Sequence, residues 1–279
     1  MQNVALQRAG VASFLIALAS TVSAADAPML DDFAVNVGLF ANSANSQVKV
    51  NSGSNAGSTI DLKNDLGMDG TRSLPFISLS WRPWERHEFE FSYFSDDQSK
   101  TRTLTRDITI RDDVYQAGAQ ISSKLSYQAF GFDYRYWLWI GDKASFGVGG
   151  GLQAYSFDLK LNGTAQITGP NGGTSTSANR TAKASTDIPD PSLGVAYRYQ
   201  AADWARFVAD AGAFKIKVGN IDATLYNARF GVEFYPWQNF GIVTQYQYNK
   251  IKAEVTKDDF NGKADFKFSG FQVLARVRF

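Results

Sequence analysis

Few residues of this 279-residue chain carry side chains that could perform catalysis or hold a metal ion. There is no Cys, and His87 is the single His, so thiolate sites and sites built from paired His are excluded. The candidates for a general base are His87, in Trp84-Glu85-Arg86-His87, and the carboxylates Glu88 and Glu90 that follow it. Whether these groups can meet a substrate depends on the elements that carry them.

A second group of oxygen-bearing side chains comes earlier in the chain, at Asp61, Asn64, Asp65 and Asp69. Carboxylate and amide oxygens suit a divalent cation, but this spacing differs from that of an EF-hand loop. Asp and Asn also stabilise turns by accepting hydrogen bonds from nearby backbone amides. We therefore favour capped turns in a solvated loop over a metal site, and we expect no metal ion and no cofactor.

Alternation of apolar and polar residues with a period of two predicts that most of the chain is antiparallel strand. Ten segments show the pattern: 33–42, 77–82, 88–93, 128–138, 145–153, 192–199, 206–213, 226–234, 240–249 and 271–279. No helical periodicity is evident after residue 24. The sequence therefore predicts an all-β fold, an up-and-down barrel of about ten strands with eight or twelve as alternatives.

The predicted connections alternate in length. Short connections are expected at Arg82–His87, Gly141–Lys143, Gln200–Asp203 and Tyr235–Asn239, and long ones at Val50–Arg72, Asp96–Gln120, Asn162–Pro191 and Glu254–Asp265. A tight turn at Gly219-Asn220 breaks the alternation. The segment Asn162–Pro191 is rich in Gly, Ser, Thr and Asn, a composition that favours a solvated loop.

The amino-terminal residues have the pattern of a secretory signal peptide. Arg8 precedes an apolar run from Ala9 to Ala19, and Val22-Ser23-Ala24 resembles a cleavage site, so residues 1–24 are expected to be removed. The run is too short for a membrane-spanning helix. Removal takes away Arg8 and no acidic residue, which leaves residues 25–279 as one neutral domain with no basic excess for nucleic acid.

The position of Trp separates a membrane-spanning barrel from a soluble one. All six Trp lie in or near the short connections, namely Trp81, Trp84, Trp137, Trp139, Trp204 and Trp237. Trp concentrates where the apolar core of a bilayer meets the headgroups, and transmembrane barrels have short turns at one end and longer loops at the other. The pattern therefore predicts a lipid-facing aromatic girdle at the short-turn end, with a soluble β-barrel as the alternative.

The chain resembles the small bacterial outer-membrane β-barrel proteins, with an architecture like that of OmpA and OmpW. The resemblance rests on Val22-Ser23-Ala24 and on a last strand of alternating Phe271, Val273, Ala275 and Val277 that ends at Phe279. It implies location in the outer membrane, recognition of the Phe279-ended strand by the barrel assembly machinery, contact with lipid and lipopolysaccharide, and a monomer. Four basic residues could meet lipopolysaccharide phosphates: Lys100, Arg102, Arg106 and Arg111.

If the apolar faces meet lipid, the charged residues of the polar faces line the lumen. They are Arg82, Glu88, Glu90, Asp133, Arg135, Arg198, Arg206, Asp210, Arg229, Glu233, Arg276 and Arg278. Arg makes bidentate contacts with carboxylates, and barrels of this size usually fill their interiors. We expect a salt-bridged plug with a structural or surface-interaction role; a narrow porin-like channel for small polar or anionic solutes, using the surplus of two Arg, is the alternative.

An outer-membrane enzyme is the third interpretation. His87 lies in a short connection at the periplasmic end, away from external substrates, and is expected to be an interfacial or turn residue. Glu88 and Glu90 lie two apart on one predicted strand near the same end, and we interpret them as partners of lumen Arg. The sequence therefore predicts a protein without catalytic activity.

Overall fold

The computed structural model describes residues 29–52, 58–68, 70–110, 113–167, 176–218, 221–257 and 260–279. The predicted signal peptide, residues 1–24, and the predicted turn residues Gly219 and Asn220 lie outside this part of the chain. No helix within it is long and apolar enough to cross a membrane.

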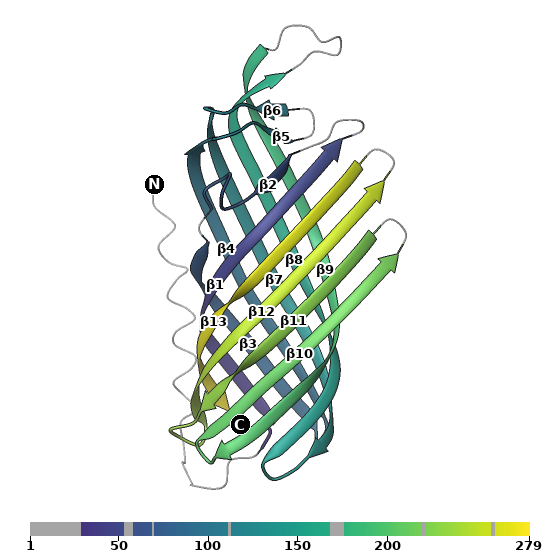
Figure 1. The fold of residues 1–279 in the computed structure, drawn as a ribbon. Coiled ribbons are helices and arrows are strands. Elements are labelled where there is room, and N and C mark those ends of the chain that lie inside the picture. Colours follow the sequence, from purple (N-terminus) through teal and green to yellow (C-terminus); the bar gives the residue numbers. More distant parts are fainter. Residues whose placement is uncertain are drawn as a thin grey trace.

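The chain forms one closed antiparallel barrel of ten long strands, as the alternation predicted (Figure 1). The strands are β1 (Phe33–Ser52), β3 (Thr71–Trp84), β4 (His87–Thr103), β7 (Gln120–Ile140), β8 (Ala144–Ile167), β9 (Thr176–Ala202), β10 (Ala205–Val218), β11 (Ile221–Phe234), β12 (Phe240–Lys257) and β13 (Phe260–Arg278). Each pairs with its neighbours along the chain, and β1 also pairs with β13 over its full length, which closes the sheet.

Three short strands lie at one end of the barrel, which we call the loop end: β2 (Thr59–Asp61), β5 (Ile108–Ile110) and β6 (Asp113–Tyr115). β2 adds to β1, β5 pairs with β6, and β6 touches β8 through Val114 and Gln166. The opposite end, which we call the short-turn end, carries the four predicted short connections and the carboxyl terminus (Figure 1).

Two of the predicted long connections are wrong. Most of Asn162–Pro191 belongs to β8 and β9, which remain paired from Ala144 with Tyr199 to Ile167 with Thr176. Likewise, Glu254–Asp265 lies mostly within β12 and β13. Their Gly-, Ser- and Lys-rich compositions resemble those of loops, but cross-strand pairing to an existing barrel wall overrides this weak local preference.

The strands are longer than predicted because their pattern continues with reversed polarity. On β8, the outward side chains change from the apolar Val148 and Leu152 to the exposed polar Ser156 and Lys160. The inward side chains change in the opposite sense, and Phe157 is buried. An apolar outer face suits lipid, whereas a polar outer face around an apolar core suits water. The barrel therefore consists of a lipid-type section and a water-type extension at the loop end.

The lipid-type section is a continuous outer belt of apolar side chains. Side chains exposed on it include Leu39, Ile77, Phe91, Phe130, Leu152, Leu193, Phe207, Phe230, Ile242 and Phe271. On β7 the belt runs from Phe130 to Trp139, close to the nine to eleven residues that a tilted strand needs to cross a bilayer.

Candidate functional site

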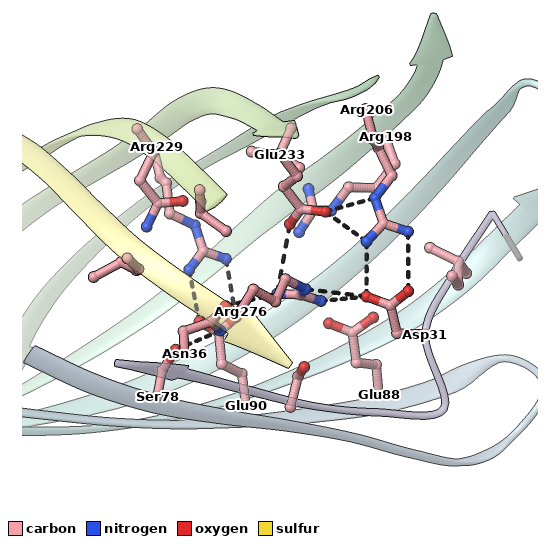
Figure 2. Close-up of a pocket in the computed structure, with 16 residues that line it drawn as sticks. Asp31, Asn36, Ser78, Glu88, Glu90, Arg198, Arg206, Arg229, Glu233 and Arg276 are labelled. Atoms are coloured by element: carbon pink, nitrogen blue, oxygen red, sulfur yellow. Dashed lines mark hydrogen bonds and ion pairs between the residues drawn. The ribbon is translucent and has the colours of Figure 1, made fainter. Parts of the chain in front are cut away.

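The lumen beside the belt is filled by two groups of charged side chains that the barrel topology brings together (Figure 2). The first, which we call the central cluster, consists of Glu88, Glu90, Arg135, Arg198, Asp210 and Arg229. Its members project from β4, β7, β9, β10 and β11, because every second residue of these strands faces inward. Residues of the predicted polar faces therefore meet in one network inside the barrel.

Each Arg of the central cluster bridges neighbouring strands. Arg135 Nη1 donates to Glu88 over 2.7 Å, and its Nη2 donates to Glu90 over 2.6 Å. Arg229 from the far side of the lumen donates to the same Glu90 over 2.6 Å. Asp210 accepts from Arg198 over 2.8 Å and from Arg229 through Nε over 2.8 Å. The contact between Arg229 of β11 and Glu90 of β4 therefore joins opposite walls of the barrel.

The second group, the terminal cluster, is organised around Asp31, which sequence reasoning missed. Asp31 precedes β1, and its side chain is only 2% exposed. It forms ion pairs with Arg206 at 2.7 Å, Arg276 at 2.5 Å and Arg278 at 3.4 Å. No strand pattern covers residue 31, so its entry into the barrel carries no signal in the sequence.

Glu233 and Tyr235 complete the terminal cluster. Arg206 Nε donates to Glu233 over 2.7 Å, and the hydroxyl of Tyr235 donates to the same carboxylate over 2.6 Å. The guanidinium of Arg278 lies 3.4 Å from the centre of the Tyr235 ring, a cation–π contact. The three Arg of this cluster therefore share two carboxylates and one aromatic ring.

Two of the predicted lumen charges stand apart. Arg82 pairs with the exposed Asp32 and donates to the backbone carbonyl of Leu30 over 3.1 Å. The carboxylate of Asp133 packs against the backbone of Gly151, in the space that a Cβ atom there would occupy. Asp133 forms no ion pair within the described residues. The two clusters, which include Asp31 and leave out Arg82 and Asp133, contain six Arg and five carboxylates, so the expected surplus of two Arg falls to one there.

The predicted Trp girdle is wrong for one residue, Trp137. Trp81, Trp84, Trp139, Trp204 and Trp237 are 49–63% exposed on the outer surface, but Trp137 is 0% exposed. A bulge between Trp137 and Trp139 shifts the register with β8 and turns Trp137 into the lumen. There its indole Nε1 donates to Glu88 over 3.0 Å, and Arg198 stacks 5.5 Å from its ring centre.

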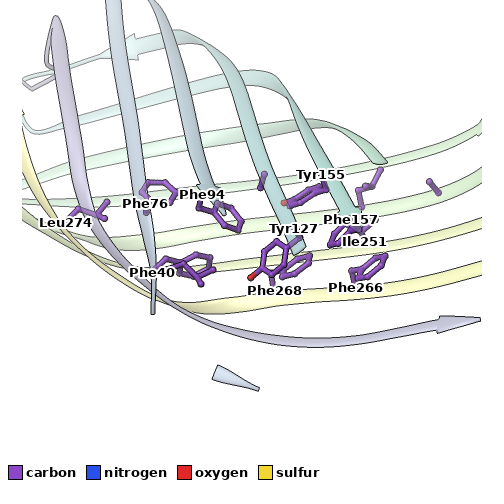
Figure 3. Packing of buried hydrophobic residues seen from close by; sticks show 14 of the residues in the cluster. Phe40, Phe76, Phe94, Tyr127, Tyr155, Phe157, Ile251, Phe266, Phe268 and Leu274 are labelled. Carbon is purple, nitrogen blue, oxygen red and sulfur yellow. The ribbon is translucent and has the colours of Figure 1, made fainter. Parts of the chain in front are cut away.

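Above the charges, towards the loop end, the lumen contains a cluster of buried aromatic residues that the sequence did not predict (Figure 3). Tyr155, Phe157, Phe266 and Phe268 have stacked rings, and Phe157 and Phe266 lie 4.4 Å apart between centres. A cavity of about 40 Å³ lies among the charges and one of about 60 Å³ lies between the central cluster and the rings. Such volumes hold one or two water molecules.

A small lid covers the aromatic cluster at the loop end. It is built from Ile60, Leu62, Leu66, Met68, Leu104, Ile108 and Tyr115, packed against Ile121, Leu125, Leu159 and Leu161 of the barrel. Arg106 fastens the lid, because its Nε donates to Asp65 over 2.9 Å. Burial alone would raise the pKa of Asp65, but hydrogen bonds from Arg106 and from the Asp61 amide hold that pKa below its ordinary value.

Asp61 and Asp65 of the lid accept hydrogen bonds from backbone amides. Asp61 accepts from the amides of Lys63 and Asn64 over 3.0 and 2.8 Å, as capped turns require. No group of metal-ligating side chains occurs among the described residues, and Asp69 and Arg111 lie outside them. Of the four basic residues considered for lipopolysaccharide, Arg102 donates to the Lys63 carbonyl and Arg106 to Asp65, both in the lid.

His87 and Phe279 lie at the short-turn end. The Nδ1 of His87 is 2.8 Å from the hydroxyl of Tyr134, and the ring packs edge-on against Trp84 and Tyr136. The carbonyl of Phe279 accepts hydrogen bonds from the amides of Asp32 and Phe33, both over 3.1 Å. The carboxyl terminus is thus tied to the start of β1.

Comparisons with solved structures identify the fold. The outer-membrane protease OmpT from Escherichia coli superposes with a TM-score of 0.58 at 11% identity, covering 89% of this chain and 97% of that one. This chain has the fold of an outer-membrane β-barrel.

Two further matches have lower TM-scores. The toluene transporter TodX from Pseudomonas putida has a TM-score of 0.37 at 10% identity, covering 90% of this chain and 91% of that one. The attachment invasion locus protein Ail from Yersinia pestis has a TM-score of 0.29 at 12% identity, covering 87% of this chain and 99% of that one. No protein-family description and no curated protein matches the sequence.

Proposed function

We propose that this protein is an integral outer-membrane barrel with a closed lumen, and that it has a structural or surface-interaction role. The observation that carries the proposal is the insertion of Asp31 among Arg206, Arg276 and Arg278. Through these contacts the segment before β1 plugs the short-turn end of the lumen. Leu30 extends the plug by packing, fully buried, against Trp137 and Ala196.

The ion pairs favour closure because of what opening would cost. A buried Arg that loses its carboxylate partner is left as an uncompensated charge, at a cost of about 3–5 kcal/mol. A water-filled path past the terminal and central clusters would have to separate several of these contacts at once. The aromatic cluster and the lid add two further layers that a polar solute would have to pass.

A solute-flux assay tests closure. Protein refolded into liposomes should give swelling rates in arabinose or glycine equal to those of lipid alone. The double variant Leu30→Ala with Asp31→Ala removes the plug contacts of the segment before β1. Because the aromatic cluster and the lid remain, its swelling rate should also stay at that of lipid alone, and a general porin serves as the open control. If liposomes with the unmodified protein swell as fast as liposomes with a general porin, the proposal of a closed lumen is wrong.

A narrow anion-preferring channel is the second candidate, and the remaining surplus of one Arg favours it. The terminal cluster would then be the selective region. In that case the double variant Arg276→Gln with Arg278→Gln would change the anion preference of the flux. Flux that persists with unaltered selectivity would exclude these residues from selecting the solute.

We further propose that the protein has no catalytic activity. His87 packs against three aromatic rings at the short-turn end and contacts Tyr134 rather than a carboxylate or a nucleophile. OmpT is a protease, and peptide cleavage is therefore the activity to assay. Cleavage of a peptide library that is lost in His87→Gln would overturn this part of the proposal.

The remaining parts of the proposal concern location and partners. The apolar belt and the five outward Trp suit placement in a bilayer as a monomer, and export would use the predicted signal peptide. The Phe279 ring is 46% exposed at the end of β13, where the barrel assembly machinery could bind it. Deletion of Phe279 should lower the amount of folded protein in cells, measured by heat-modifiable migration, without preventing refolding in detergent.

A further inference from the structure

Two lysines are direct cross-strand neighbours on the outer surface of the barrel. Lys250 of β12 is opposite Lys267 of β13, with Tyr226 of β11 next to Lys250 in the same row. Like charges directly opposite one another destabilise a sheet. Within the described residues, neither lysine forms an ion pair with a carboxylate, and Lys267 instead lies 5.5 Å from the ring centre of Tyr248. The arrangement is suited to an anion from outside the protein.

The lysines lie at the outer boundary of the apolar belt. Counted towards the loop end, Lys267 lies two outward positions beyond Phe271 on β13. Lys250 lies one outward position beyond Tyr248 on β12. One outward position is two residues, or about 6.7 Å along a strand, and a tilt of about 40° reduces this to about 5 Å of height. The ammonium groups therefore lie about 5–10 Å above the last aromatic side chains, at the level of headgroup phosphates.

A groove adjoins the lysine pair on the side away from the belt. Its volume is about 440 Å³, and its lining residues are Gln47, Thr59, Asp222, Thr224, Lys252, Ala253, Glu254, Lys263 and Asp265. Lys252 is opposite Asp265, and Lys263 pairs with Glu254 at 2.7 Å, so the groove offers balanced charges and several hydrogen-bonding groups. Such a lining suits hydroxyl-rich sugars rather than a second strongly charged group.

We propose that the outer face of β11, β12 and β13 binds a phosphorylated glycolipid of the outer leaflet. Lys250 and Lys267 hold its phosphate, Tyr226 and Tyr248 contact the sugar–lipid boundary, and the groove takes the first sugars beyond it. This inference rests on the proposed placement in the outer membrane. It assigns the lipopolysaccharide contact to the barrel wall instead of to Arg102 and Arg106.

A second lysine row, formed by Lys124, Lys160 and Lys183 on β7, β8 and β9, supplies the main competitor. Lys160 lies eight residues beyond Leu152, the last exposed apolar side chain on β8. That distance places it about 20 Å above the belt along the tilted strand. This row is too high for a phosphate attached directly to the lipid anchor, which is why the β12–β13 pair is preferred.

The test measures binding of deep-rough lipopolysaccharide to the full-length refolded protein in detergent, by calorimetry and by native mass spectrometry. The double variant Lys250→Gln with Lys267→Gln should bind at least tenfold more weakly. The control double variant Lys63→Gln with Lys143→Gln removes the same charge from the lid and from a short turn, and should change affinity less than twofold. Dephosphorylated glycolipid should bind the unmodified protein as weakly as the double variant binds the phosphorylated form.

Three results would overturn the inference. One is unchanged affinity in Lys250→Gln with Lys267→Gln, and another is a tenfold loss only in Lys124→Gln with Lys160→Gln. The third is equal displacement of the glycolipid by millimolar inorganic phosphate, which would indicate a free-phosphate site. Heat-modifiable migration confirms that each variant is folded, and the single variant Lys267→Gln serves if the double variant is not. Flux through the lumen is measured separately, so an open lumen would refute the proposed function without affecting this site.

Discussion

At the scale of single residues, neighbouring acids show how strongly environment determines the contribution of a charge. Asp31 and Asp32 both pair with Arg, but the Asp31 side chain is 2% exposed and that of Asp32 is 76% exposed. A buried carboxylate that neutralises several guanidinium groups is costly to remove, whereas an exposed pair contributes little. Substitutions at these two neighbouring positions therefore compare a buried carboxylate with an exposed one.

Asp31→Asn should lower the free energy of unfolding by about 3–5 kcal/mol, because Arg206, Arg276 and Arg278 lose their shared carboxylate. Urea titration of the refolded protein, followed by heat-modifiable migration, measures the change. Asp32→Asn is the matched control and should cost less than about 1 kcal/mol. Equal effects of the two substitutions would show that Asp31 is not anchored in the lumen.

Trp137 should differ from the other five Trp in its access to lipid. Brominated acyl chains quench the fluorescence of a Trp that touches the bilayer, and Trp137 is fully buried inside the barrel. A variant that retains only Trp137 should be almost unquenched, whereas one that retains only Trp139 should be strongly quenched. Similar quenching of both would place Trp137 on the outer face after all.

The Asp65–Arg106 pair should make the lid sensitive to acid. The pKa of Asp65 lies below its ordinary value of 3.8, so the stabilisation is complete above about pH 4 and is lost as the pH falls further. Pepsin should therefore cleave the lid near Leu62 and Leu66 only well below pH 4. Arg106→Gln should allow cleavage already at pH 4, with a loss of about 1 kcal/mol. Cleavage of both proteins over the same pH range would disprove this fastening.

At the scale of elements, the reversal of polarity along the strands marks the proposed membrane boundary. On β8 it falls between Leu152 and Ser156. Because the chain has no Cys, single cysteines can be introduced without interference. Ser156→Cys should react with a membrane-impermeant maleimide in intact cells, whereas Val148→Cys should remain unlabelled until the membrane is dissolved. Labelling of both positions would mean that the apolar belt does not lie in lipid.

The same reversal explains what could be predicted from the sequence. Strands of the lipid-type section were identifiable because apolar residues such as Phe130 and Phe132 mark one face. In the water-type extension, Tyr155 and Phe157 mark the opposite face amid Ser, Asp and Lys, and the mixture resembles a loop. The charges of the central cluster followed from strand parity, but Asp31 and Trp137 did not, since a segment before β1 and a bulge in β7 depend on tertiary packing.

Closure of the barrel depends on a close approach between its first and last strands. At Gly270 of β13, a Cβ atom would overlap the carbonyl oxygen of Ala41 in β1. Only Gly fits this position without displacing the β1–β13 pairing. At the short-turn end, backbone hydrogen bonds between Phe279 and Phe33 also join these two strands.

At the scale of the whole molecule, the interior is a stack of four layers. From the short-turn end these are the segment carrying Leu30 and Asp31, the two charge clusters (Figure 2), the aromatic cluster (Figure 3) and the lid. Ion pairing links the first two layers, ring stacking holds the third, and aliphatic packing dominates the lid. If the lumen is closed as proposed, a solute would have to disturb all four layers, and weakening one layer alone is not expected to open a continuous path.

The central claim is that this stack closes the lumen, and single-channel recording in a planar bilayer tests it most directly. After insertion of the refolded protein, confirmed by protease protection of the reconstituted sample, the account predicts no stepwise conductance in 1 M KCl. Reproducible steps of constant size from the unmodified protein would contradict it.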